Sequence, residues 1–491
     1  CSVTEGASMN EIAELLKTYG PMLSGDLARL YERIYGVSNE AARKALSRAN
    51  APVKKLYKIK FDKNQLFYYL DSQFMGGKYV ESLLQAVEKH SKVVYTYFQA
   101  FVSQSGVVSK ELLPAFVSAP IGKVKGHRQH EDVLAKLIDA QIIKDDGENT
   151  YSISPMFHEA INAKRSRGLE IAKNVITQDF NTWARSVNLV AYERGRCLFE
   201  NPSFGQFQWA YTAPSYIQPL CSYKIGKPGF VVADVFFGKT ATPESISFFL
   251  QKIKVLRSYK NIQPFLPVLL VDKVDHDALE QLKENKVMVA LLNNMFSNRY
   301  TELLNDLVNV FANATAILSN DPGQINDLFK AIEKNEGRYN NLAGDLFELL
   351  VGSYYSRIGC QYLKAQEEVI DCTTGKKKEI DLLVVKDGKC IVVECKAQRV
   401  KLNGEYVRKW LNDNIPVIRK CLLERGYYNK MEFQLWSVSG FDDDALTLLK
   451  KAEASTKYSV TYYSREQMIA TAKDKGDRYF VDIIKKHFTP K

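Results

Sequence analysis

The sequence predicts a multidomain protein that combines α+β and α/β domains. At 491 residues the chain exceeds what one hydrophobic core usually serves, so about three domains are expected. The front carries short helical patterns that end in strand hairpins, whereas the rear carries apolar strand patterns separated by helical ones. These two kinds of pattern predict different types of domain in one chain.

The composition is typical of a globular protein. Hydrophobic residues make up 46% and charged residues 25% of the chain. No apolar run reaches the length of a membrane span and no signal peptide is visible, so we expect a cytoplasmic protein with no membrane partner. Residues Cys1–Ser8, ahead of Met9, do not resemble a native N-terminus and are left out of the domain prediction. The net charge of +11 favours an anionic partner.

The eight cysteines and six histidines do not suggest a metal or disulfide framework. The cysteines are widely spaced or lie in strand patterns, and none forms a C-x-x-C pair. We therefore expect no zinc site and no structural disulfides.

The first domain is predicted over residues 9–75. Helices are expected from Ile12, from an N-capping Ser24 and over Ser38–Leu46. Strands over Leu56–Lys60 and Gln65–Tyr69 then flank a short turn. Three helices followed by such a hairpin are typical of a winged helix-turn-helix domain.

Basic residues are concentrated in this domain. Eight basic and two acidic side chains lie between Glu40 and Lys63. A helix that enters the major groove and a wing that follows phosphates both require such charge, so DNA is the expected partner. The alternative is a winged helix used only for protein contacts. The candidate DNA-binding residues are Arg43, Lys44, Arg48, Lys54, Lys55, Lys58 and Lys60.

A second, weaker winged-helix pattern covers residues 76–160. Helices are expected over Leu83–Ser103, from Ser109 and over His130–Ala140, followed by a hairpin over Ile142–Ile153.

The rear of the chain carries the residues that suggest chemistry. Two apolar strands are joined by the reversal signal Asp387-Gly388, so Asp381 on the first should lie beside the second. On the second strand Glu394, Lys396 and Gln398 share one face. A solvated strand can carry Glu-x-Lys by chance, but the apolar neighbours predict a mostly buried sheet, where unpaired charges are costly.

The expected helix over Asn341–Ile358 carries Glu348 at the edge of its apolar face. It could be an ordinary exposed helix residue. Together with Asp381 and Glu394 it could also complete a set of hard oxygen ligands for Mg²⁺, while Lys396 positions water and offsets phosphate charge.

In this order of residues the segment 338–491 resembles the PD-(D/E)XK nuclease superfamily, with its restriction-endonuclease-like αβββαβ fold. The Gly-x-x-x-Glu helix and the Glu-x-Lys-x-Gln strand are most similar to the Mrr and Holliday-junction-resolvase branch. The resemblance implies that Glu348, Asp381 and Glu394 bind Mg²⁺ or Mn²⁺. It also implies that Lys396 orients the attacking water and that Gln398 supports the lysine or contacts the phosphate.

The segment 170–320 is predicted to be an α/β domain and a degenerate copy of the last one. Val231–Gly238 can be aligned with Ile391–Gln398, and later strands and helices follow in the same order. In this alignment Phe236 takes the place of Lys396, so the copy should be inactive and serve for packing, an extended nucleic-acid groove or homodimerisation. A separate ligand-sensing domain is the alternative.

The sequence as a whole predicts a metal-dependent DNA endonuclease of restriction or defence type. The alternatives are a repair or recombination nuclease that cuts branched DNA and a non-enzymatic DNA-binding regulator with a relic nuclease fold. The residues do not distinguish DNA from RNA.

Overall fold

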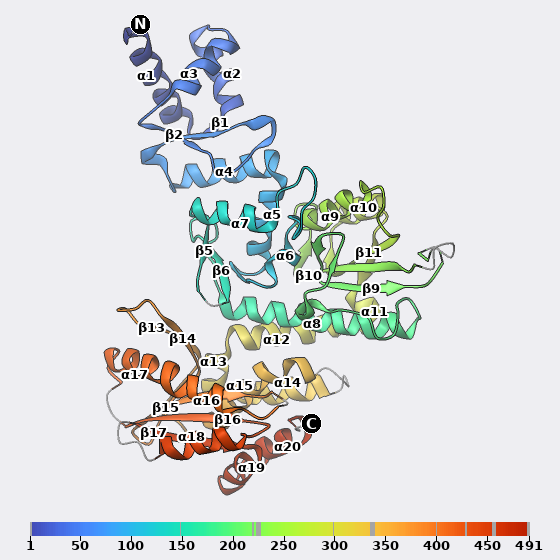
Figure 1. The fold of residues 1–491 in the computed structure, drawn as a ribbon, viewed down its shortest axis with the longest axis vertical. Coiled ribbons are helices and arrows are strands. Elements are labelled where there is room, and N and C mark those ends of the chain that lie inside the picture. The colour runs from blue at the N-terminus through green and yellow to red at the C-terminus, as the bar shows by residue number, and fades with distance from the viewer. Residues whose placement is uncertain are drawn as a thin grey trace. The chain divides into compact units, whose positions relative to one another are not determined.

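A computed structural model gives a mixed α/β chain that separates into two compact units, residues 1–304 and 305–491 (Figure 1). Side chains are described from residue 11 onward, apart from 331–333 and 339–343. Within the described part, no helix is long and apolar enough to cross a bilayer. The structure describes residues 2–147, 149–218, 220–221, 227–297, 299–333, 339–398, 400–427, 430–453 and 458–488.

The first domain has three helices and a three-stranded sheet of order β1-β3-β2. Ser38, predicted as the first residue of the third helix, is its N-cap, and its side chain accepts from the Ala41 amide. Ser24 differs from the prediction: it is the first residue of α2, and its hydroxyl accepts instead from the Leu66 amide, which ties the helix to the sheet. The elements are α1 (Ser2–Tyr19), β1 (Met22–Leu23), α2 (Ser24–Tyr35), α3 (Asn39–Arg48), β2 (Val53–Leu56) and β3 (Phe67–Leu70).

The predicted first wing strand, Leu56–Lys60, is wrong in position. Strand β2 ends at Leu56, and the ten residues before β3 form a long connection. Ile59 and Phe61 within it are buried. The apolar pattern that suggests a strand therefore reflects packing of a loop.

The long helix predicted over Leu83–Ser103 is two helices, α4 (Gly77–His90) and α5 (Lys92–Ser103), because Ser91 leaves the helical conformation at φ −146° and ψ 62°. Tyr79 of α4 packs edge-on against Phe67 and Tyr69 of β3. Helix α4 thus covers the sheet of the first domain, and the second domain begins at α5.

The second domain repeats the order of elements of the first, and its sheet order β4-β6-β5 corresponds to β1-β3-β2. A strand, β4, occupies the start of the helix predicted from Ser109, and the helix itself begins only at Leu113. The elements after α5 are β4 (Val107–Ser109), α6 (Leu113–Phe116), α7 (His130–Asp139), β5 (Ile143–Asp145) and β6 (Thr150–Ile153).

The middle domain is a four-stranded sheet of order β12-β11-β10-β9 with a core of buried aromatic and aliphatic side chains. Strand β9 runs antiparallel to β10, and β10, β11 and β12 run parallel. The elements are α8 (Ala163–Ser186), β7 (Ser203–Phe204), β8 (Phe207–Gln208), β9 (Tyr211–Ser215), β10 (Gly229–Ala241), α9 (Ser247–Arg257), β11 (Phe265–Val274), α10 (His276–Glu284), β12 (Met288–Leu291) and α11 (Leu292–Met295).

The C-terminal unit is built on a five-stranded sheet of order β13-β14-β15-β16-β17. Strands β13 to β15 are antiparallel neighbours, whereas β15, β16 and β17 run parallel. The first elements are α12 (Tyr300–Ala312, across the unit boundary), α13 (Ala314–Asn320), α14 (Gly323–Glu333), α15 (Tyr339–Arg357), β13 (Tyr362–Ile370), β14 (Lys377–Lys386) and β15 (Lys389–Lys396). After them come α16 (Gly404–Lys409), α17 (Ile415–Glu424), β16 (Lys430–Ser437), α18 (Asp443–Glu453), β17 (Ser459–Ser464), α19 (Arg465–Asp474) and α20 (Arg478–His487).

The sheets of the middle domain and the C-terminal unit share one topology. Strands β9 to β12 have the same order and directions as β14 to β17, and each set has a helix between its second and third strands. Strand β13 has no counterpart in the four-stranded sheet. The agreement in strand order expected from the sequence alignment is therefore found in the structure.

Candidate active site

The predicted hairpin brings Asp381 and Glu394 together. Asp387 and Gly388 adopt φ values of 50° and 73°, the left-handed conformations that a two-residue turn between antiparallel strands requires. The turn fixes a register in which Leu382 lies opposite Val393. Asp381 and Glu394, the next residue on each strand, therefore project from neighbouring positions on one face.

Lys396 lies between the two carboxylates. Its Nζ is 2.8 Å from Glu394 Oε1 and 3.5 Å from Asp381 Oδ2. Asp381 is 8% exposed, and its Oδ2 also accepts a 2.7 Å hydrogen bond from the Cys395 amide. The sequence prediction that Asp381, Glu394 and Lys396 converge is confirmed.

Glu348 of α15 belongs to the same electrostatic cluster. Burial raises its pKa well above the usual value, and the negative charge of Asp381 raises it further. Its Oε2 accepts from Gln366 Nε2 at 3.3 Å. The third predicted carboxylate is thus close enough to Asp381 for the two charges to repel.

Asp381 itself shows the excess of negative charge. Burial and the nearby Glu394 raise its pKa to about 7, although Lys396 and the Cys395 amide act in the opposite direction. For Lys396, burial favours the neutral amine, but Asp381 and Glu394 outweigh it and hold the pKa above its ordinary value. The site therefore holds a permanently charged ammonium and more carboxylates than this ammonium can neutralise.

Two residues of the cluster were not found by sequence reasoning. The hydroxyl of Tyr406, on α16, donates to Glu394 Oε1 at 2.7 Å. Gln366 lies on β13 between the register pairs Ala365–Leu382 and Glu367–Ile380, with a φ of 52° that non-glycine residues rarely adopt. An N-capping Asn403 before Tyr406 signals the helix start, but no sequence signal reports either contact.

Gln398 is placed differently from the other predicted residues. Strand β15 ends at Lys396, and Gln398 follows as an exposed residue whose backbone carbonyl accepts from Ser439 Oγ at 2.6 Å. Its predicted support of Lys396 remains a prediction.

The donor set suits a hard divalent cation in chemistry. Glu348, Asp381 and Glu394 offer carboxylate oxygens, the ligands that Mg²⁺ and Mn²⁺ prefer. Their mutual repulsion favours a bound cation. Among the side chains that the structure describes, no three histidine, cysteine, aspartate or glutamate residues are already arranged to hold a metal ion, and Lys396 Nζ lies between Asp381 and Glu394.

Comparisons of the chain with protein-family models, with curated proteins and with solved structures found no match.

The middle domain places different residues at the corresponding positions. When Asp234 of β10 is set at the position of Glu394, the strand register puts Phe236 at Lys396 and Ala210 at Asp381. Phe236 is buried in the domain core. Of the three charged side chains at Asp381, Glu394 and Lys396, the middle domain therefore keeps a counterpart of Glu394 alone.

That carboxylate is neutralised from a helix. Lys252 of α9 is 0% exposed and its Nζ lies 2.9 Å from Asp234 Oδ2. The same ammonium donates to the carbonyls of Ala115 and Gln208 at 2.6 and 2.9 Å, and Asp234 Oδ1 accepts from the Ala210 amide. The pair is fully hydrogen-bonded and buried, as a structural ion pair must be.

The predicted DNA-binding residues fall into two groups. Arg43, Lys44 and Arg48 are exposed on α3, where Lys44 also pairs with Glu40 at 2.8 Å. Lys54 and Lys55 lie on β2. Lys54 Nζ is 3.5 Å from Asp71 Oδ2, and Lys55 Nζ donates to the Ser47 carbonyl at 2.8 Å. Exposed pairs of this kind contribute little stability, so the lysines can exchange partners.

Lys58 and Lys60 form the other group. Lys58 Nζ is 2.8 Å from Asp139 of the second domain, and the Lys60 carbonyl accepts from Ser91 Oγ at 2.7 Å. The two lysines therefore do not belong to a free wing beside β2 and β3, as the sequence suggested, but to the junction of the two front domains.

Proposed function

We propose that the C-terminal unit is a metal-dependent nuclease that hydrolyses phosphodiester bonds, with DNA as its substrate. The observation that carries the proposal is the placement of Lys396 Nζ between Asp381, in the middle of β14, and Glu394, near the end of the neighbouring strand β15. The order of helix, three antiparallel strands, helices and a parallel strand supports the resemblance to PD-(D/E)XK nucleases.

A bound Mg²⁺ or Mn²⁺ would supply Lewis-acid activation of water and of the scissile phosphate. Glu348, Asp381 and Glu394 are the residues that would hold it. Lys396 remains an ammonium at neutral pH because its pKa is raised. It therefore orients water and neutralises phosphate charge rather than accepting a proton. The Tyr406 hydroxyl holds Glu394 in position.

The remaining domains support binding rather than chemistry in this proposal. The two front domains share one order of helices and strands, which supports their assignment as winged helices, and α3 of the first presents three exposed basic side chains. The middle domain, with Lys252 and Asp234 locked together, serves as an inactive nuclease-like copy. A restriction or defence role is one assignment for such a protein, and cleavage of branched DNA in repair is the other.

The decisive experiment compares Lys396→Met with a matched control, Lys389→Met. Both lysines lie on β15 and both form an ion pair with a carboxylate, since Lys389 is 3.1 Å from Glu432 at the opposite end of the strand. Cleavage of linear duplex, branched and single-stranded DNA is measured with Mg²⁺ and with chelator. Loss of a positioned charge or donor commonly costs about 10²–10⁴-fold in rate.

We expect K396M and Asp381→Asn to lose cleavage on every substrate while folding and DNA binding persist, and K389M to cut normally. Cleavage by K396M at the parental rate would refute the proposal. Cleavage by the wild-type protein in the presence of chelator would refute it as well. A protein that binds DNA but cuts none of the three substrates would favour the regulator alternative.

A further inference from the structure

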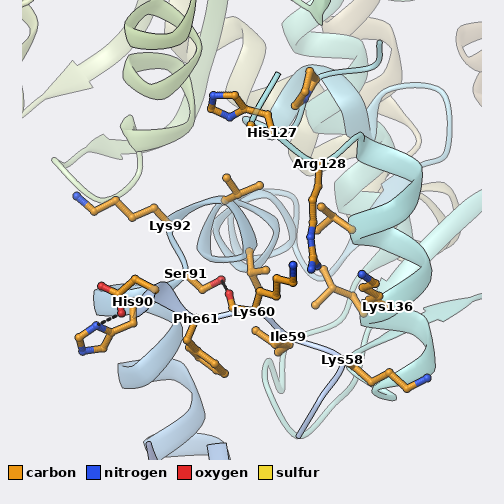
Figure 2. A pocket seen from close by; sticks show the side chains of 17 residues that line it. Lys58, Ile59, Lys60, Phe61, His90, Ser91, Lys92, His127, Arg128 and Lys136 are labelled. Carbon is orange, nitrogen blue, oxygen red and sulfur yellow. Dashed lines mark hydrogen bonds and ion pairs between the residues drawn. The ribbon is translucent and has the colours of Figure 1, made fainter. Parts of the chain in front are cut away.

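A pocket of about 470 Å³ lies where the first and second domains meet (Figure 2). We call it the interdomain pocket. It is formed by the connection between β2 and β3, the junction of α4 with α5, and α7 with the loop before it. Its volume is in the range of small-ligand sites.

Cations dominate its polar lining. Lys58, Lys60, Lys92, Arg128 and Lys136 line the pocket, against Asp62 as the acidic member. Lys58 forms an ion pair with Asp139, which is not part of the lining. The Asp62 carboxylate lies 2.9 Å from His90 Nδ1. The other four cations have no carboxylate within ion-pair distance among the described residues.

Three of these cations converge. Figure 2 shows the ends of Lys60, Arg128 and Lys136 turned toward one another along one wall. The pKa of Lys136 is lowered, first by partial burial and then by the charges of Arg128 and Lys60. The Asp132 carboxylate acts on the pKa of Lys136 in the opposite direction but does not cancel these effects. Like charges held together without a paired carboxylate create a local attraction for an anion.

The wall that carries Lys60 is fixed by packing. Ile59 and Phe61, on either side of it, are 2% and 4% exposed, and Ser91 Oγ donates to the Lys60 carbonyl. Val94 and Leu137 add further apolar surface to the lining. The site thus combines several cationic side chains, one of them on a backbone fixed by packing, with apolar lining residues. Cations suit phosphate groups, and apolar surface suits a sugar and a base.

We propose that the interdomain pocket binds nucleotide phosphate groups, supplied either by a free nucleotide or by a nucleic-acid strand. This site lies in residues 1–304 and goes beyond the proposed cleavage by residues 305–491. Binding can be measured in chelator, so its outcome is independent of whether the protein is a nuclease.

The test neutralises the three converging cations in the full-length protein as K60Q/R128Q/K136Q. Lys58 is left unchanged to keep its pair with Asp139. The matched control is K254Q/R257Q/K260Q, which removes two lysines and one arginine from exposed positions at the end of α9 and just beyond it. Titrations use AMP, a labelled single-stranded oligonucleotide and a labelled duplex.

We expect the pocket variant to bind at least one of these probes ten-fold or more weakly than wild type and the control to bind normally. For a single strand, the slope of log K against log salt should become shallower by about 2 in the variant. Each of the three removed cations would otherwise neutralise one phosphate, and each such contact contributes about 0.7 to the steepness of the slope. Loss of AMP binding identifies a free nucleotide as the source, whereas loss confined to oligonucleotides identifies a strand.

A second variant, Val93→Trp, keeps every charge but narrows the pocket from its lining. It answers the question if the triple variant fails to fold. Equal affinity of wild type and both pocket variants for all probes, equal weakening in the control, or no binding by wild type would each overturn the proposal.

Discussion

Replacing Lys252 by methionine tests whether the middle domain depends on its buried ion pair. The substitution keeps the length of the side chain but leaves Asp234, which is 1% exposed, without its counter-charge. Breaking a buried pair from one side costs about 3–5 kcal/mol. The carbonyls of Ala115 and Gln208 lose their donor as well, at about 1–3 kcal/mol for each buried group. We therefore expect a loss of at least about 3 kcal/mol in the stability of this domain.

The double variant D234N/K252M should recover about 2 kcal/mol of that loss. The amide that replaces the Asp234 carboxylate carries no charge, and its oxygen can still accept from the Ala210 amide as Asp234 does. Hydrogen exchange of β10 amides through a urea series measures the stability of this sheet. The control is Lys254→Met, an exposed lysine of the same helix. A loss below about 1 kcal/mol in K252M, or no recovery in the double variant, would refute the account of this pair.

Three further predictions concern other parts of the chain. Burial lowers the pKa of His130 to about 4, so below pH 6.5 the unfolded state binds more protons; stability of the second domain should fall by about 2 kcal/mol from pH 7.5 to pH 5, and His130→Gln should abolish this slope in hydrogen exchange of α7. Tyr406→Phe should slow cleavage about 10–100-fold at unchanged DNA affinity, because a hydrogen bond to the charged Glu394 is worth about 1.5–3 kcal/mol; unchanged single-turnover rates would contradict this. R43Q/R48Q should weaken duplex binding and reduce its salt slope by about 2 in a gel-shift titration, and an unchanged slope would exclude α3 as a contact surface.

The convergence of the candidate site was predictable because it depends on local rules. The turn at Asp387-Gly388 and the period of two along a strand suffice to bring Asp381, Glu394 and Lys396 together. Tyr406 and Gln366 could not be found in this way, since a helix packed on the sheet and an irregular strand position bring them in.

The same limit explains the errors at the front of the chain. Ile59 and Phe61 alternate with lysines like a half-buried strand, but their burial arises from packing of a loop. A loop and an edge strand can show one hydrophobic pattern, and only tertiary contacts distinguish them. Lys252 was missed for a related reason, because a lysine within a helix is normally exposed and only its buried partners reveal its role.

The position of Lys252 also constrains any attempt to restore activity to the middle copy by design. Phe236→Lys alone would place a second ammonium beside one aspartate in a closed core, where an unpaired charge is costly. Ala210→Asp would supply the missing carboxylate, but the ammonium of Lys252 would still occupy Asp234. A design that restores activity would therefore have to replace Lys252 on α9 first. Only then could the substitutions at Phe236 and Ala210 create a free acidic site.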